Sequence, residues 1–242
     1  MTNCPNGQLC IAGLGPGDPE LLTLKALRAL ERADYIFAPC PSATRPSLAA
    51  SIITAANPAL EGKIIKLVFP MSANSSELAL AWQEAEETIA GYLLQGHNCV
   101  FATEGDPLLY GTFSYISPRL AGRINELPFK YIPGISSPFA AASATGLPLT
   151  LGEDKLAILP ATCGIEQIEQ ALGSFEAVAL LKVSAIYPRI ISLLKGKGLL
   201  EKCSLVCHAS SPQQQIISGE EALKNICPPY FSILLIRSKK DE

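Results

Sequence analysis

One turn sequence most constrains what this chain can fold into. The apolar run Cys99-Val100-Phe101 leads into Glu104-Gly105-Asp106-Pro107, where a glycine and a proline flank a carboxylate. This composition predicts a sharp, stiff turn at the carboxyl end of a strand. In open α/β sheets, ligands bind beyond the carboxyl ends of the strands. Two interpretations therefore stand: Asp106 faces a ligand, or it bonds its own backbone in an ordinary turn.

Apolar runs alternate with amphipathic segments along the first half of the chain. This alternation predicts an α/β fold built from right-handed βαβ units. The strands are expected at residues 8–12, 35–38, 64–68 and 99–101, and the helices at residues 23–33, 47–56, 77–94 and 112–121.

The pattern restarts in the second half, where a strand at residues 129–132 is followed by the small-residue helical run 140–144. Further strands are expected at residues 155–159, 177–182, 203–208 and 231–236, with helices at 165–172 and 186–194. A boundary near residues 119–125 would give two α/β domains, 1–120 and 121–242, with a ligand crevice between them.

Three local features are also predicted from side-chain spacing. The first helix is expected to carry an apolar stripe of Leu24, Leu27 and Leu30. The cations Lys25, Arg28 and Arg32 lie outside that stripe. Trp82 is expected in the core, and the charged residues from position 237 onward are expected to form a tail.

A second glycine-rich loop, Gly13-Leu14-Gly15-Pro16-Gly17-Asp18, follows the first strand. It lacks the third glycine of a dinucleotide-binding fingerprint, because Asp18 stands at that position. It also lacks the Gly-Lys-Ser/Thr of a phosphate-binding Walker loop. Taken alone, the loop indicates no more than a tight connection between strand and helix.

Composition excludes several classes of function. The net charge is −3 and there is no Lys/Arg run, which argues against a nucleic-acid-binding surface. No stretch reaches the ~18 apolar residues of a membrane span, and residues 1–7 lack the pattern of a signal peptide. We therefore expect a cytoplasmic protein. The eight cysteines have no metal-binding spacing, so reduced thiols and no metal site are expected.

Three loops in order carry a family resemblance: Gly13 to Asp18, Glu104 to Tyr110, and Pro133-Gly134-Ile135-Ser136-Ser137. With them the chain resembles the tetrapyrrole methylases over nearly its whole length. Phe69-Pro70-Met71, Trp82 and the stretch 105–113 are most similar to the precorrin-2 / cobalt-factor II C-20 methyltransferases. Gly111 stands where many of those enzymes have Ser.

The resemblance implies a homodimer of two-domain subunits that uses S-adenosylmethionine in cobalamin (corrin) biosynthesis. The implied reaction is methylation of the C-20 meso carbon of precorrin-2 or cobalt-factor II, with the cofactor in the crevice between the domains. Motif matching places the cofactor contacts on Pro16, Gly105, Asp106, Leu108, Tyr110, Thr112, Ser136 and Ser137, and more loosely on Lys182, Ala209 and Ser232.

The chemistry itself needs little from side chains. Methyl transfer from a sulfonium to an electron-rich meso carbon is accelerated chiefly by orientation. No catalytic residue is assigned firmly and Asp18 is the one candidate, since His97 and His208 have no evident acid partner. Asp18 has two equal interpretations, positioning the ring or capping the helix after Pro19. Arg45 is the candidate to bind substrate carboxylates, with a solvated loop arginine as its alternative.

Other functions remain open at this point. The chain could methylate a different ring carbon, uroporphyrinogen III, or a non-tetrapyrrole such as diphthine. It could instead be a non-catalytic nucleotide-binding module that kept the glycine loops. An RNA methyltransferase on this fold is disfavoured by the acidic balance.

Overall fold

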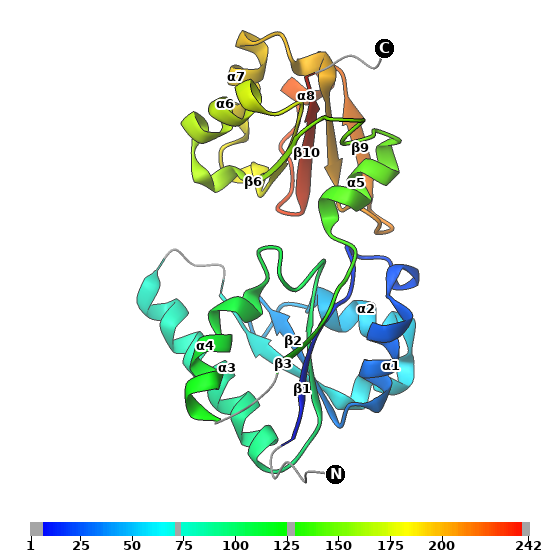
Figure 1. The fold of residues 1–242 in the computed structure, drawn as a ribbon, viewed down its shortest axis with the longest axis vertical. Coiled ribbons are helices and arrows are strands. Elements are labelled where there is room, and N and C mark those ends of the chain that lie inside the picture. Colours follow the sequence, from blue (N-terminus) through cyan, green and yellow to red (C-terminus); the bar gives the residue numbers. More distant parts are fainter. Residues whose placement is uncertain (1–6, 71–73, 125–128, 239–242) are drawn as a thin grey trace. The chain divides into compact units, whose positions relative to one another are not determined.

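The computed structural model describes residues 7–70, 74–124 and 129–238. Contacts divide the chain into two units, Met1–Ser136 and Ser137–Glu242 (Figure 1). The division falls later than the expected position near residue 120. The reason is that the strand β5 (Phe129–Ile132) pairs with β1 (Leu9–Gly13) and so belongs to the first sheet.

The first unit is a parallel five-stranded sheet with the order β3-β2-β4-β1-β5. The predicted α/β class is confirmed, and every strand expected here is present within about two residues of the predicted ends. The remaining elements are α1 (Leu24–Arg32), β2 (Tyr35–Cys40), α2 (Leu48–Ala56), β3 (Ile64–Val68), α3 (Ser75–Leu94), β4 (Cys99–Thr103) and α4 (Ser117–Arg123).

Successive side chains along each strand point to opposite faces of this sheet, so the sheet has a core on each face. Ile11 and Phe101 pack with residues of α3 and α4, whereas Ala12 and Ala102 pack with residues of α1 and α2. Figure 1 shows these two helix pairs on opposite sides of the strands. Because both faces are covered, the strands read as continuous apolar runs in the sequence.

Local capping chemistry fixes several helix ends as the sequence predicts. Thr23 Oγ1 accepts the Ala26 N–H at 3.1 Å and begins α1. Gly96, at φ 86°, ends α3 by donating its N–H to Leu93 O at 3.0 Å. Gly96 thus acts as the predicted helix cap.

Three sequence expectations about the first unit are wrong in detail. Leu24 is 69% exposed, because the buried face of α1 runs through Ala26 and Leu30 instead. Trp82 is only half-buried and stacks on exposed Tyr115, with ring centroids 5.1 Å apart. The helix expected from residue 112 is a 3-10 turn, Thr112–Tyr115, followed by α4 with a proline in its first turn.

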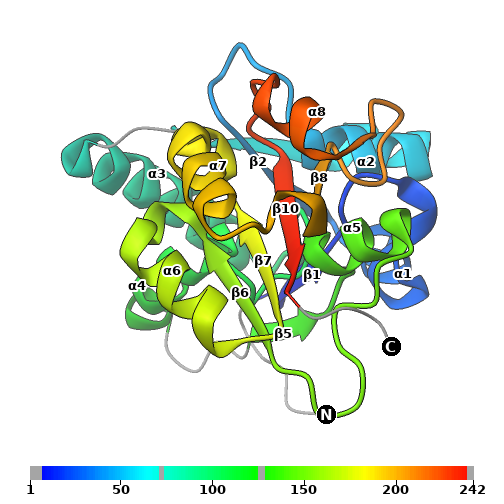
Figure 2. The same ribbon diagram turned by 90° about the horizontal axis from the view of Figure 1, so that it is seen from above.

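The second unit is a mixed sheet with the order β6-β7-β10-β8-β9. β6 and β7 are parallel, whereas β10 is antiparallel to both β7 and β8. Helices α6, α7 and α8 pack on one face and α5 on the other (Figures 1 and 2). The elements are α5 (Ser137–Thr145), β6 (Leu156–Pro160), α6 (Ile165–Ser174), β7 (Ala177–Leu181), α7 (Tyr187–Gly196), β8 (Cys203–Cys207), β9 (Gln215–Ser218), α8 (Glu220–Lys224) and β10 (Ser232–Arg237).

Arg237 is not part of a charged tail but the last residue of β10, and its side chain is 5% exposed. Its guanidinium pairs with the buried Asp154 carboxylate at 3.0 Å and donates to the carbonyls of Pro148 and Leu149. This group ties the connection between α5 and β6 to the end of β10. β9 and α8 are also absent from the sequence prediction.

No helix in the part of the chain that the structure describes is long and apolar enough to cross a bilayer.

Candidate cofactor-binding site

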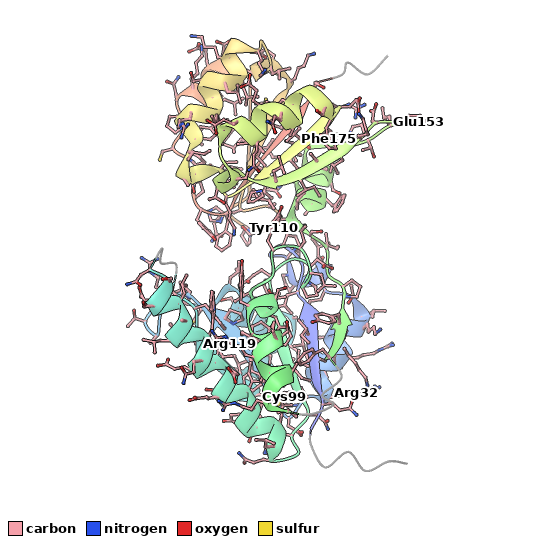
Figure 3. All side chains as sticks on the ribbon, turned by 60° about the vertical axis from the view of Figure 1, so that its left-hand side comes forward. Arg32, Cys99, Tyr110, Arg119, Glu153 and Phe175 are labelled. Atoms are coloured by element: carbon pink, nitrogen blue, oxygen red, sulfur yellow. The ribbon has the colours of Figure 1, made fainter. Side chains whose placement is uncertain are left out.

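The three glycine loops meet at the carboxyl ends of the strands of the first sheet because of strand order and register. β1 lies between β4 and β5, with Gly13 opposite Thr103 and Ala12 opposite Ile132. Since all three strands run parallel, the loops that leave their carboxyl ends emerge side by side. In Figure 3, Tyr110 marks this edge, at the opposite end of β4 from Cys99.

Backbone hydrogen bonds join the first two loops. Leu14 N donates to Thr103 O at 2.9 Å, and Gly15 and Gly105 exchange two bonds of 3.3 and 2.7 Å. Both glycines have positive φ, 78° at Gly15 and 67° at Gly105, a conformation that side chains other than glycine's disfavour. The two loops therefore continue the sheet pairing past the ends of the strands.

Gly13 and Gly134 allow the backbones of the three loops to touch. A Cβ on Gly13 would lie 2.5 Å from Gly105 O and 2.6 Å from Gly134 N. A Cβ on Gly134 would lie 2.2 Å from Gly105 O. We call this contact of Gly13, Gly105 and Gly134 the glycine junction. Gly13 and Gly134 are explained by packing between the loops, and Gly105 by its positive φ.

Asp106 forms the local turn that was one interpretation of the sequence, and it also contacts the third loop. One carboxylate oxygen accepts the Leu108 N–H at 2.9 Å, which is the expected local turn. The other accepts the Gly134 N–H at 3.2 Å, which links the second loop to the third. The side chain is half-buried, so its carboxylate positions the glycine junction whether or not it also touches a ligand.

The other cofactor candidates follow the junction glycines in the three loops. A Cβ built on Gly105 would meet no atom closer than Ser136 Cα, 4.0 Å away. Leu108 and Tyr110 are 65% and 48% exposed. Pro16, Thr112, Ser136 and Ser137 are half-buried. Backbone, hydroxyl and apolar groups are thus available here to a ligand.

Four residues other than glycine have positive φ among the described residues: Tyr110, Lys182, His208 and Ser210. All four follow the carboxyl end of a strand, β4, β7 or β8. Such conformations cost about 1–3 kcal/mol each and concentrate at ligand-binding sites. The strain therefore marks the same strand ends that the motifs indicate.

The second sheet brings its three candidate cofactor contacts to the same end of its strands. β10 runs antiparallel to β7 and β8, so its first residue, Ser232, lies beside their last residues and is paired with Cys207. Lys182 and Ala209 follow those strands. Ser232 is buried and its hydroxyl already donates to Pro229 O at 2.7 Å. A ligand contact at this position would therefore use neighbouring backbone groups.

The two residues proposed for the substrate differ in their surroundings. Asp18 Oδ1 accepts the Glu20 N–H at 2.8 Å and caps the 3-10 turn that begins at Pro19. The structure thus provides the capping role that was one interpretation of Asp18. Arg45 is exposed in the loop after β2. The base of that loop is closed by Ser47, whose hydroxyl donates to Pro39 O at 2.6 Å.

Glu104, which the sequence reasoning did not single out, lies directly between β4 and the glycine junction. Burial raises the pKa of this carboxyl group, although hydrogen bonds from its own backbone and from that of Ala49, at the start of α2, oppose the rise. The signal that could have identified it is a carboxylate at the first position after a buried strand.

The two histidines and the buried thiols of Cys99 and Cys203 lie in packed surroundings. His97 packs its ring against Tyr35 and His208 against Phe231. Burial raises the pKa values of Cys99 and Cys203 to about 12, which keeps both thiols protonated. Within residues 7–70, 74–124 and 129–238, no group of three or more His, Cys, Asp or Glu is placed to hold a metal ion.

The family model for tetrapyrrole (corrin/porphyrin) methylases matches residues 8–223 of this chain. The chain belongs to the tetrapyrrole methylase family. It is 31% identical to the precorrin-2 C(20)-methyltransferase of a Sinorhizobium species, over 100% of this chain and 99% of that protein. It is 36% identical to the probable cobalt-precorrin-2 C(20)-methyltransferase of Methanocaldococcus jannaschii, over 94% and 95% of the two chains.

Solved structures of similar proteins share the tetrapyrrole methylase fold. A cobalt precorrin-4 methyltransferase superimposes with a TM-score of 0.73 at 22% identity, covering 95% of this chain and 94% of its own. The uroporphyrin-III C-methyltransferase of Thermus thermophilus, solved in complex with S-adenosyl homocysteine, gives a TM-score of 0.67 at 21% identity. The alignment covers 96% of this chain and 97% of that one.

Proposed function

We propose that this tetrapyrrole methylase transfers a methyl group from S-adenosylmethionine to the C-20 meso carbon of precorrin-2 or its cobalt-containing counterpart. The observation that carries the proposal is the full-length likeness to C(20)-methyltransferases, at 31–36% identity. The related uroporphyrin-III methyltransferase that was solved with S-adenosyl homocysteine supports the choice of cofactor.

The cofactor contacts that we propose are the eleven residues predicted from the motifs. Eight of them lie in or directly after the three loops of the glycine junction, where Gly105 leaves open space and exposed Leu108 offers an apolar contact. A cofactor with a nucleoside, a sulfonium and an amino-acid group fits such a mixture of backbone, hydroxyl and apolar groups. The remaining three contacts are the strand-end positions Lys182, Ala209 and Ser232.

When bound, S-adenosylmethionine supplies an electrophilic methyl group attached to a sulfonium. In the net reaction a carbon–carbon bond forms at C-20, the carbon–sulfur bond breaks with its electron pair on sulfur, and the C-20 proton leaves to solvent. We propose that the chain contributes orientation and needs no essential acid or base. Good alignment of this kind is worth effective molarities of roughly 10⁵ M or more. The glycine junction supplies the rigidity that alignment requires.

Arg45 is the residue proposed to bind the carboxylates of the tetrapyrrole. Its guanidinium has no partner among the residues that the structure describes, and it stands on a loop whose base is closed by Ser47. A guanidinium can hold a carboxylate with two parallel hydrogen bonds. Methylation at another ring carbon, or of uroporphyrinogen III, is the second candidate, because uroporphyrin-III methyltransferases share the fold.

The deciding experiment is mass spectrometry of the products after incubation with isotopically labelled cofactor and each candidate acceptor. A single labelled methyl at C-20 of precorrin-2, with or without cobalt, is expected. A product labelled at a different carbon would contradict the proposed position, and cofactor binding without any product would favour the nucleotide-binding module. His97→Ala and His208→Ala should retain turnover within about tenfold if orientation dominates.

We also propose a homodimer located in the cytoplasm. The dimer is supported by the family likeness and by exposed apolar side chains such as Phe139 and Tyr230. The location is supported by the biosynthetic relatives. Sedimentation at micromolar protein should give the mass of two chains, and a single-chain mass at that concentration would contradict the dimer.

A further inference from the structure

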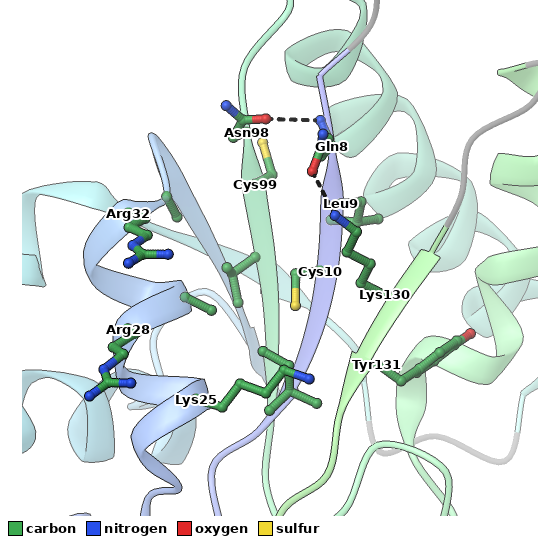
Figure 4. A pocket seen from close by; sticks show the side chains of 14 residues that line it. Gln8, Leu9, Cys10, Lys25, Arg28, Arg32, Asn98, Cys99, Lys130 and Tyr131 are labelled. Atoms are coloured by element: carbon green, nitrogen blue, oxygen red, sulfur yellow. Dashed lines mark hydrogen bonds between the residues drawn. The ribbon is translucent and has the colours of Figure 1, made fainter. Parts of the chain in front are cut away.

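A groove of about 850 Å3 lies on the α1 side of the first sheet, toward the amino ends of β1 and β4. We call it the α1 groove (Figure 4). Its floor includes Cys10, Val100 and Ile132 from three neighbouring strands. In Figure 3, Arg32 and Cys99, which both line it, are at the opposite end of the unit from Tyr110. The α1 groove is therefore separate from the glycine junction.

Topology explains why this face is hollow. In a βαβ sheet the helix that follows a strand normally covers the adjacent face. The helix that follows β5 is α5, whose Ala141 packs in the core of the second sheet with residues of β7, β8 and β10. Among the described residues of the first unit, the helical residues in the core on the α1 side come from α1, α2 and the 3-10 turn Pro58–Lys63, and Ile132 is the one β5 residue in that core.

Cations line this groove on both sides. Lys25, Arg28 and Arg32 are three and four residues apart in α1, so they share one face of the helix. Lys130 reaches the groove from β5, on the opposite side of Cys10 (Figure 4). All four side chains are exposed.

No carboxylate forms an ion pair with these cations within the described part of the chain. The residues that line the groove include no Asp or Glu, and none of the four cations forms an ion pair there. Lys130 Nζ donates only to the neutral Gln8 Oε1, at 3.1 Å. Asp34, just beyond α1, directs its carboxylate to the Asn98 N–H at 2.8 Å.

The charges of both lysines act on the Cys10 thiol at the floor of the groove. Burial raises its pKa, and the charges of Lys130 and Lys25 both oppose that rise. Both ammonium groups are therefore near enough to act on one atom at the floor. A ligand that sits on Cys10 would be within reach of cations from both sides.

We propose that the α1 groove binds an organic polyanion, a small molecule with an apolar body and two or more carboxylates. The apolar floor accommodates the body, and the lysine and arginine side chains bind the acid groups. The volume lies in the range of small-molecule sites, about 300–1,000 Å3. Four cations around one groove of a chain whose net charge is −3 repel one another, and a bound anion relieves that repulsion. The proposal does not depend on methyl transfer.

Alkylation of Cys10 tests occupancy of the groove directly. Full-length protein saturated with S-adenosyl homocysteine is treated with iodoacetamide, and the rate at each cysteine is followed by peptide mass spectrometry. Uroporphyrin I, an octacarboxylate with a large apolar body, is the probe, and citrate is the acid without such a body. Cys227 is exposed and lies in the second unit, so it serves as the internal reference.

Uroporphyrin is expected to slow alkylation of Cys10 and leave Cys227 unchanged, with citrate protecting at much higher concentration. The double variant Lys25→Gln, Lys130→Gln should raise the half-protecting concentration about tenfold, since two charge-assisted contacts are lost. The matched control is Lys66→Gln, which removes an exposed cation of β3 outside the groove. Protection should also weaken at an ionic strength near 1 M, where the Debye length is about 3 Å.

Three results would overturn the proposal. The first is a Cys10 rate that neither probe changes. The second is equal protection in the double variant and in Lys66→Gln. The third is a Cys10 rate that falls with rising protein concentration in the absence of probe, which would assign the groove to a second copy of the chain. Each of these leaves the methyl-transfer assay unaffected, so the two proposals fail independently.

Discussion

Replacing Gly134 with alanine tests whether the glycine junction sets the geometry of the cofactor site. The added Cβ would lie 2.2 Å from Gly105 O and 2.8 Å from the Cα and carbonyl carbon of Gly13. Ordinary contact distances are nearer 3.5 Å, so the loops must separate by roughly 1 Å. The φ of Gly134 is not in the left-handed region, so the substitution changes packing and leaves the preferred backbone conformation accessible.

Two magnitudes follow from that separation. Insertion of a methyl group into closely packed backbone should lower the free energy of unfolding by about 1–3 kcal/mol. A displacement of ~1 Å at the reacting atoms can cost about 10²-fold in rate. Gly134→Ala should thus reduce single-turnover methyl transfer about a hundredfold while the protein stays folded.

Gly91→Ala is the matched control. Gly91 lies inside α3, and an added Cβ would have no heavy atom outside the helix within 4 Å. It should raise the free energy of unfolding by about 0.5–1 kcal/mol and leave turnover unchanged. Urea denaturation and rapid-quench kinetics on both variants give the comparison. Normal turnover in folded Gly134→Ala would refute the claim that loop spacing controls catalysis.

Three further predictions concern single side chains. Arg237→Met and Asp154→Asn should each lower the free energy of unfolding by about 3–5 kcal/mol in urea titrations, because each removes the counter-ion of a buried charge; a loss below about 1 kcal/mol would contradict this. Burial raises the pKa of Glu104 above its ordinary 4.5, so the folded state holds this proton more tightly and stability falls as pH rises through that raised pKa. Glu104→Gln should remove the fall, so its stability relative to the parent grows as the pH rises above the ordinary value of 4.5. A constant or reversed difference would exclude the assignment. Arg45→Ala should raise KM with little change in kcat, as for a contact made equally in ground and transition states, and an unchanged KM would leave Arg45 a solvated residue.

The strands of the first unit were predictable because both faces of a parallel sheet are buried. Continuous apolar runs such as 64–68 and 99–101 stand out between glycine and proline positions. β9 was missed because it is a four-residue strand at the end of the second sheet with mostly exposed side chains. α8 was missed because five residues are too few to establish a helical period.

The positions of the candidate loops were also predictable, but their mutual contacts were not. Glycine spacing indicated three tight turns. Gly13 and Gly134 must be glycines because the backbones of neighbouring loops touch there, and the sequence does not show which strands are neighbours. The same limit applies to the α1 groove. Lys130 is far from Arg32 in the sequence, and only the pairing of β5 with β1 brings them to one surface.

The distribution of strain relates the fold to the proposed chemistry. Positive φ values of 49–56° occur at three residues that follow strands. Tyr110 lies in the loop after β4, whereas Lys182 and His208 directly follow β7 and β8. Such conformations persist only where the surroundings over-determine them. In the first unit that constraint comes from two Gly15–Gly105 hydrogen bonds and the two accepted by Asp106. A reaction that depends on alignment rather than on acids and bases needs loops held in this way, and their backbone contacts leave the side chains beside them free to differ among members of the family.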